Sequence, residues 1–218
     1  TFPPNDDLPY VVHFPTYAAT AHYQKKLSPA MQAKPLETFL DEVRDFTENN
    51  YSPALFKGTR ISDKEKQELA EKMVQYAGTS TVYWSRANLK VKAGEYFNEL
   101  MREEGKTVGR LDSRYTGINE NPKNQYAITD PQSDAISPAY TIGFLDYLHR
   151  DLGVSKELNY KTSAGVADDN FKWDWSHRGN RGWGTQIAIN TSIDMASALS
   201  KDPNLKVLIM NGYYDLAI

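Results

Sequence analysis

The sequence predicts a mainly helical fold that ends in a short helix–strand unit. Three observations lead to this prediction. Apolar residues recur at three- and four-residue spacing in several segments. Serine, proline and glycine stand where the ends of those segments are expected. Near the end of the chain, the apolar run from Leu205 to Met210 is rich in strand-forming residues.

Two helices are predicted most clearly. Residues 36–46 carry an apolar face directly after Pro35, a residue that suits the first turn of a helix. A second helix is expected to open at Ser62, because Ser62 and Glu65 form a capping-box pattern, and to end at Gly78.

Four further helices follow from weaker patterns. We expect one from Thr16 to Lys26, one before Gly105, and one from Pro138 to Gly153. The last of these three is expected to turn four residues inward: Tyr140, Phe144, Tyr147 and Leu148. A final helix with a face from Ile189 to Leu199 precedes the strand.

Two segments between these helices have a different composition. Residues 117–138 and 161–186 are rich in Gly, Asn, Asp, Pro and Ser, and both are predicted to be long irregular connections. Loops of this length in a compact domain are typically functional or mobile.

The composition excludes several classes of function. The 218-residue chain has no cysteine, so disulfides, thiolate metal sites and a cysteine nucleophile are all excluded. Its net charge of -3 does not suit a nucleic-acid-binding surface. The longest apolar stretch, Val207–Met210, is far too short to span a bilayer. We therefore expect no nucleic-acid partner, no membrane partner, no metal and no cofactor.

Asp215 follows the predicted strand after a short polar turn. In open α/β sheets, active sites form just past the carboxyl ends of the strands, so this position makes Asp215 a candidate catalytic carboxylate. The alternative is an ordinary turn or capping aspartate.

Four segments together resemble a known family. They are Asp7–Tyr10 with Phe14–Lys26, Thr107–Gly117 (TVGRLDSRYTG), Trp173–Trp175, and Lys206–Ala217 (KVLIMNGYYDLA). In order and spacing they resemble the bacterial branch of the serine carboxypeptidase family of α/β-hydrolases.

This resemblance implies a helical lid, or cap, inserted into a hydrolase sheet. Residues 1–16 would belong to the hydrolase core, residues 17–186 to the lid, and residues 187–218 to a helix and sheet strand that end at the catalytic acid. Asp215 matches that acid, whose role is to orient the catalytic histidine. The implied location is periplasmic or secreted, and the implied substrate is a peptide.

The other two members of the triad have no match in this sequence. No G-x-S-x-G pattern occurs, and the family's order is serine, acid, histidine. The serine is therefore expected before Thr1 and the histidine after Ile218, in a remainder of the hydrolase domain that would act as a partner. We expect this chain alone to be inactive, and His13, His22, His149 and His177 to have structural roles.

Aromatic side chains of the lid are candidates to line the substrate cleft. The candidates are Tyr17, Tyr23, Trp84, Tyr115, Trp173 and Trp175. For each, burial in the core is the alternative. Arg110, Asp112 and Arg114 are expected to form an internal ion-pair network, with carboxylate recognition by arginine as the alternative.

Other functions remain open at this stage. The chain could be a helical peptide- or carbohydrate-binding module in which Asp215 is incidental. The same scaffold could also serve an acyltransferase or an esterase. Because the strand at Leu205–Met210 would lack neighbours in this chain, it is expected to pair with a second copy in a homodimer, to pack on lid helices, or to fray.

Overall fold

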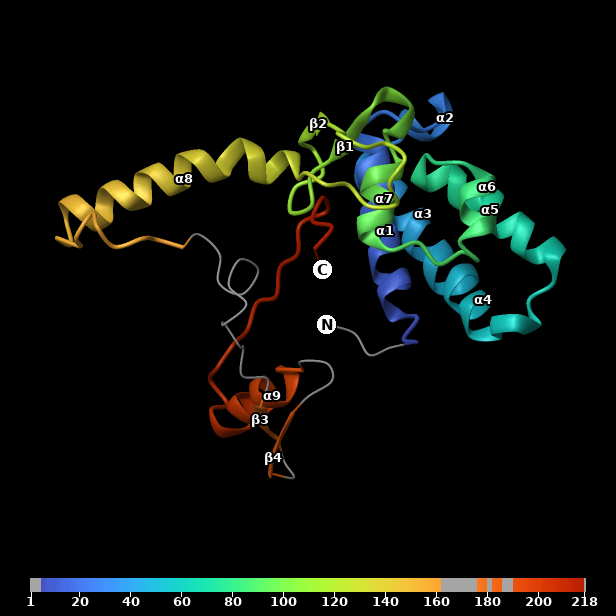
Figure 1. The fold of residues 1–218 in the computed structure, drawn as a ribbon. Helices are drawn as coiled ribbons and strands as arrows, with labels where there is room; N and C mark the ends of the chain where they lie inside the picture. Colours follow the sequence, from blue (N-terminus) through green and yellow to red (C-terminus); the bar gives the residue numbers. More distant parts are fainter. Residues whose placement is uncertain (1–4, 162–175, 180–181, 186–189, 218) are drawn as a thin grey trace. The chain divides into compact units, whose positions relative to one another are not determined.

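The computed structural model describes residues 5–161, 176–179, 182–185 and 190–217 (Figure 1). Its helical elements are α1 (Leu8–Tyr23), α2 (Pro29–Gln32), α3 (Leu36–Phe46), the π-helical turn η1 (Thr47–Tyr51), α4 (Ser52–Lys57), η2 (Gly58–Arg60), α5 (Asp63–Ala77), α6 (Thr81–Arg86), α7 (Ala93–Glu99), η3 (Arg102–Glu104), α8 (Pro131–Arg150) and α9 (Ser192–Lys201). The strands are β1 (Lys106–Val108), β2 (Thr116–Ile118), β3 (Ser176–Gly179) and β4 (Gly182–Thr185). The prediction of a mainly helical chain is confirmed.

The chain forms two compact units. One, here called the helical unit, contains residues 7–136 and 211–218. The other contains residues 1–6 and 137–210. The division into residues 1–16, 17–186 and 187–218 that the resemblance implies concerns a larger protein, so it stays a prediction.

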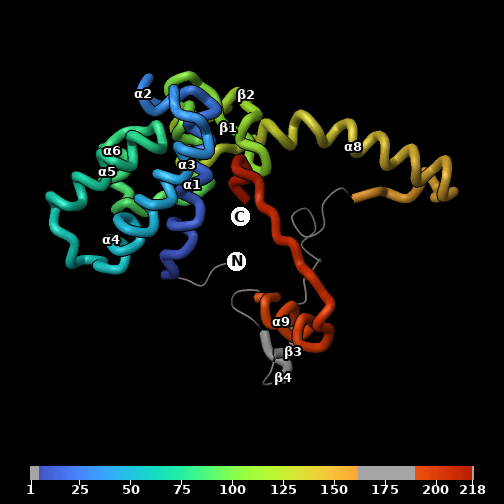
Figure 2. The backbone as a smooth tube through the Cα atoms, turned by 180° about the vertical axis from the view of Figure 1, so that it is seen from behind, coloured from blue at the N-terminus to red at the C-terminus, as the bar shows by residue number. Residues whose placement is uncertain are grey.

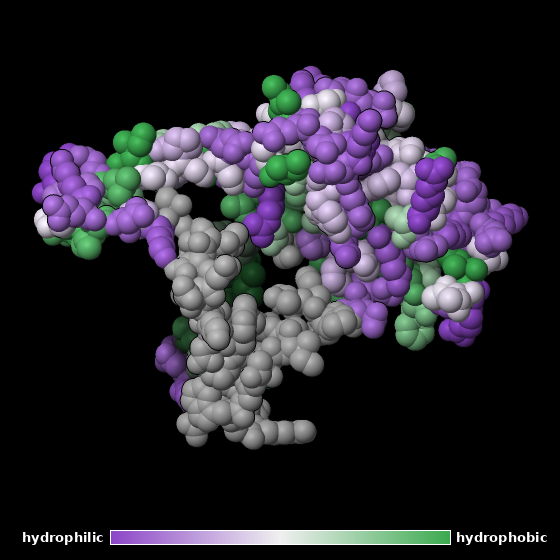
Figure 3. Space-filling view, in the orientation of Figure 1, coloured by the Kyte–Doolittle hydropathy of each residue, from purple (hydrophilic) through white to green (hydrophobic). Residues whose placement is uncertain are grey.

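An aromatic cluster forms the core of the helical unit, where α1 packs against α3 and α5. Phe14 of α1 is fully buried, and its ring centroid lies 5.4–5.8 Å from those of Phe46, Tyr51 and Trp84. Rings at these separations and tilted angles pack favourably beyond the area that they bury. The face of the unit that Figure 3 shows is mostly hydrophilic.

Buried tyrosines tie this core together through their hydroxyl groups. Tyr17 stacks on Tyr96 with 4.1 Å between ring centroids, and its hydroxyl donates to the Val91 carbonyl at 3.1 Å. The Tyr96 hydroxyl lies 2.7 Å from the Tyr17 carbonyl and 3.0 Å from that of Ala77. Burial raises the pKa of both phenols well above the ordinary value, so both stay neutral donors.

The two clearest helix predictions are confirmed. Helix α3 covers Leu36–Phe46, and α5 begins after Ser62, whose hydroxyl oxygen accepts from the Glu65 N–H at 3.2 Å. Gly78 ends α5 with φ of 69°, a conformation that favours glycine.

The predicted starts of two other helices are wrong. Helix α1 begins at Leu8 rather than Thr16, because Pro9 falls in its first turn, where a missing N–H costs nothing. Helix α8 begins at Pro131, and Pro138 lies inside it. Asp130 explains this early start, since its carboxylate accepts from the Gln132 N–H and the Ser133 hydroxyl, both at 3.1 Å.

The face of α8 that was expected to turn inward is largely exposed. The exposed fractions are 73% for Tyr140, 44% for Phe144 and 45% for Tyr147. In the described part of the chain, Phe144 makes ring contacts with Tyr147 and Tyr160, and neither contact covers the face. The apolar spacing does correspond to a helix, but spacing alone does not supply a packing partner.

The irregular segments also differ from the prediction. Residues 131–138 are helical, so the first connection is shorter than expected. Within the second, β3 and β4 pair as an antiparallel hairpin. The remaining parts of that segment lie outside the described residues.

The predicted strand at Leu205–Met210 does not form. Its side chains are exposed, with fractions of 81% for Leu208, 75% for Ile209 and 81% for Met210. A strand is defined by hydrogen bonds to a neighbouring strand. Among the described residues, no strand pairs with this segment. The prediction of a C-terminal helix is confirmed by α9, which runs from Ser192 to Lys201 before a turn, while Ile189, the first residue of the predicted face, lies outside the described residues.

Phe14→Ala should destabilise the chain by about 3–5 kcal/mol, because the substitution removes a fully buried ring from the aromatic cluster. Urea unfolding followed by circular dichroism measures this loss. Phe56→Ala is the matched control, because Phe56 is 86% exposed and its loss should change stability by less than about 0.5 kcal/mol. Equal effects of the two changes would contradict the assigned core.

Candidate functional site

The candidate site is built around the tight loop, residues 109–115, that joins β1 to β2. The two strands pair antiparallel, with Val108 opposite Thr116, and the Gly109 N–H donates to the Tyr115 carbonyl at 3.0 Å. A side chain at Gly109 would place Cβ 2.4 Å from the Asp112 carbonyl oxygen. The closeness of the backbone therefore requires glycine at this position.

Helix α1 holds this loop through buried polar contacts. The hydroxyl oxygens of Thr20 and Ser113 lie 2.6 Å apart, and both side chains are fully buried. One turn further along α1, the Gln24 amide donates to the Ser113 carbonyl at 2.8 Å. Because an unpaired buried hydroxyl is costly, these contacts fix the loop against α1.

The loop in turn binds the C-terminal segment, residues 211–217 (Figure 2). The Ser113 N–H donates to the Tyr214 carbonyl at 2.9 Å, and the Leu216 N–H donates to the Arg110 carbonyl at 2.8 Å. The Leu216 side chain is only 2% exposed. The backbone is therefore held on both sides of Asp215.

Aromatic contacts strengthen this attachment. The Tyr214 ring lies 5.2 Å from the Arg114 guanidinium carbon and meets the Tyr23 ring edge-on at 5.4 Å. The Tyr213 hydroxyl donates to a carboxylate oxygen of Glu37 at 2.9 Å. The segment is thus anchored on α1, on α3 and on the loop.

Asp215 has one carboxylate oxygen engaged and one available. Its Oδ1 accepts from the Ala217 N–H at 2.8 Å, and its own N–H donates to the Gly212 carbonyl at 3.2 Å. Within the described part of the chain, no donor contacts Oδ2. The residue is also partly exposed. Its carboxylate is therefore held in one orientation through Oδ1, and Oδ2 is available to accept a hydrogen bond.

The ion pair expected in the loop is present between two of the three charged residues. Arg114 donates to both carboxylate oxygens of Asp112, at 2.9 and 2.7 Å, in bidentate geometry. These hydrogen bonds lower the pKa of Asp112 and raise that of Arg114. Arg110 contributes its backbone, since its N–H donates to Asp130 and its carbonyl accepts from Leu216.

The aromatic candidates separate into three groups. Tyr23 and Tyr115 lie at the site, and they are 48% and 42% exposed. Tyr17 and Trp84 are buried in the core, with exposed fractions of 1% and 0%, which is the alternative considered for them. Trp173 and Trp175 lie outside the described residues.

Three histidines bond backbone carbonyl groups. His13 Nδ1 lies 2.6 Å from the Pro9 oxygen, and His22 Nε2 lies 3.1 Å from the Lys34 oxygen. His149 Nδ1 lies 2.9 Å from the oxygen of Val154, just past the end of α8. These contacts suit structural roles.

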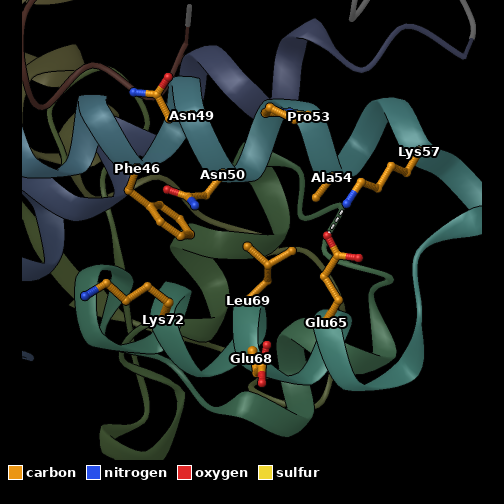
Figure 4. Close-up of a pocket in the computed structure, with 10 residues that line it drawn as sticks. All are labelled: Phe46, Asn49, Asn50, Pro53, Ala54, Lys57, Glu65, Glu68, Leu69 and Lys72. Carbon is orange, nitrogen blue, oxygen red and sulfur yellow. Dashed lines mark hydrogen bonds and ion pairs between the residues drawn. The ribbon is translucent and has the colours of Figure 1, made fainter.

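A separate pocket of about 550 Å³ lies between η1 and α4 on one side and α5 on the other (Figure 4). Phe46, Asn50 and Leu69 face the same space, and an ion pair between Lys57 and Glu65 closes one end. Glu68 and Lys72 add charges of both signs. The lining therefore combines an apolar floor with amides and charges of both signs.

The sequence analysis missed this pocket. Its wall includes Asn49 and Asn50 of the π-helical turn, a rare element that is frequent at functional sites. The only signal in the sequence was a polar interruption, TENNY, after an amphipathic helix. Of the candidates that the structure describes, neither Asp215 nor Tyr17, Tyr23, Trp84 or Tyr115 lines it.

The described residues form neither a metal site nor a membrane span. No group of three or more His, Asp or Glu side chains there is arranged to hold a metal ion. None of the helices found there combines the length and apolar character needed to cross a membrane.

Comparisons with known proteins give no match. No family model, no curated protein and no solved structure is significantly similar to this chain.

The ion pair predicts a low titration midpoint for Asp112. Its pKa in the folded chain lies below the ordinary 3.8, because Arg114 donates to the ionised form. A carboxylate with a lowered pKa stabilises the fold above its ordinary pKa, and this contribution is lost as the pH falls through the folded pKa. NMR titration of the Asp112 carboxyl carbon measures the midpoint.

Arg114→Gln should move that midpoint up toward the ordinary value. Arg110→Gln, in the same loop, is the matched control and should leave it in place, because Arg114 is the donor to Asp112. A midpoint at or above 3.8 in the unmodified chain would refute the assignment.

Proposed function

We propose that this chain supplies the lid and the catalytic aspartate of a serine carboxypeptidase-like hydrolase, which removes residues from the C-termini of peptides through an acyl-enzyme. The observation that carries the proposal is the way in which Asp215 is held. Its backbone is held through Tyr214 and Leu216, one carboxylate oxygen is engaged by the Ala217 N–H, and the other is open.

This arrangement suits the acid of a catalytic triad. Such a carboxylate accepts the imidazole N–H, selects the tautomer in which the other nitrogen can take the serine proton, and stabilises the imidazolium that forms. It must therefore be ionised, immobile and open on one oxygen. The contacts of Asp215 meet the last two requirements.

The exposed rings at the candidate site support the lid assignment. Tyr23 places apolar surface against Tyr214 in the segment that carries the carboxylate, and Tyr115 is an exposed ring at the end of the loop that binds this segment. Aromatic walls of this kind accept bulky apolar side chains of a peptide substrate. The remaining two triad residues would come from the remainder of the hydrolase domain, and the proposed location is periplasmic or secreted.

The exposed segment Leu205–Met210 supports a partnership with that remainder. Leu208, Ile209 and Met210 are each at least 75% exposed, although their sequence is typical of a buried parallel strand. In the proposed enzyme, strands of the hydrolase sheet cover them. A second copy of this chain is the other partner that such an edge would accept.

The proposal predicts that Asp215→Asn lowers kcat by roughly 10³–10⁴-fold in the gene product that contains this chain, because asparagine would favour the wrong imidazole tautomer. The measurement is release of the C-terminal amino acid from an N-blocked dipeptide. The fold should be retained, because asparagine Oδ1 can still accept from the Ala217 N–H.

Asp202→Asn is the matched control. Asp202 makes the same kind of local bond, with its Oδ1 accepting from the Asn204 N–H at 2.9 Å. This change should leave turnover within about twofold, as expected for a surface substitution. Near-normal turnover of the Asp215→Asn enzyme would exclude a catalytic role for Asp215. Absence of any peptidase activity in the folded wild type would exclude the carboxypeptidase itself.

A further inference from the structure

The C-terminal segment begins with a chemically labile pair. Asn211–Gly212 is the single Asn–Gly sequence in the chain. The chain passes from one compact unit to the other immediately before it, since Met210 ends one unit and Asn211 resumes the helical unit.

The surroundings of this pair leave the side chain open to attack by the backbone. Asn211 is exposed, and its Nδ2 donates to the Gly212 carbonyl at 3.2 Å, so the amide is folded toward the following residue. Among the described residues, the Gly212 N–H has no hydrogen-bond acceptor. Gly212 also lacks the side chain that would hinder the approach of its nitrogen to Asn211 Cγ.

We propose that Asn211 is a site of spontaneous deamidation through a cyclic imide. The Gly212 nitrogen loses its proton and forms a bond to Asn211 Cγ, while the Cγ–Nδ2 bond breaks and Nδ2 leaves as ammonia. Water then opens the ring. Cleavage of the bond between the ring nitrogen and Cγ gives aspartate, and cleavage of the bond to the main-chain carbonyl carbon gives isoaspartate.

The products alter the attachment of the C-terminal segment. Both add a negative charge at residue 211, and isoaspartate also lengthens the backbone by one methylene group directly before Gly212. The Gly212 carbonyl accepts the Asp215 N–H, so this change enters the turn that holds the carboxylate. A consequent loss of turnover rests on the proposed function, whereas the deamidation itself does not.

The test is incubation of the 218-residue chain in mildly alkaline and mildly acidic buffer, followed by trypsin digestion and mass spectrometry. Cleavage after Lys206 isolates residues 207–218, in which Asn211 is the single side-chain amide. We expect this peptide to gain one nominal mass unit, faster in alkaline buffer, and to become a substrate for isoaspartyl methyltransferase.

Two controls make the outcome decisive. Asn204, also exposed but followed by leucine, lies in a separate tryptic peptide and should react several-fold more slowly. Gly212→Ala should slow the reaction at Asn211 by a similar factor, and the added Cβ would meet its nearest neighbour, Asp215 Cβ, at 4.0 Å, so the fold tolerates it. An unchanged mass of residues 207–218, or equal rates at Asn204 or in the Gly212→Ala chain, would overturn the proposal.

Discussion

The buried face of helix α1 is the constraint on which the rest of the described structure depends. Phe14 and Tyr17 on this face are fully enclosed by rings from α3, η1, α6 and α7. Burying a tyrosine is favourable only when its hydroxyl has a partner. Tyr17 and Tyr96 meet this condition by bonding backbone carbonyls far along the chain, so side-chain packing and backbone path are determined together.

The same helix connects the core to Asp215. One turn beyond Tyr17, Thr20 contacts Ser113, whose backbone N–H binds the Tyr214 carbonyl. A chain of buried or partly buried hydrogen bonds thus connects helix α1, through the β1–β2 loop, to the segment that carries the Asp215 carboxylate. A functional group held on a rigid element in this way loses little entropy when a partner side chain binds to it.

Local signals in the sequence predicted the structure well, and long-range contacts did not. Helix α5 was predicted because the signals at its two ends are local. Ser62 and Glu65 form its N-terminal cap, and Gly78 ends it. The predictions of an inward face on α8 and of a strand at Leu205–Met210 were wrong, because burial and strand pairing require partners elsewhere in space. Asp215 was singled out by its place after an apolar run, and Arg110, Asp112 and Arg114 by their charges. The contact between the two segments was not predicted, since it joins residues about a hundred positions apart.

The most direct test of this account is amide hydrogen exchange at Leu216 in the wild-type chain and in Thr20→Val. Valine has a similar shape but leaves the buried Ser113 hydroxyl without its partner. If α1 positions the segment through the loop, exchange at Leu216 should accelerate several-fold in the variant, while amides in the middle of α5 keep their protection. Unchanged exchange at Leu216 in a folded variant would show that Asp215 is held without help from α1, contrary to this account.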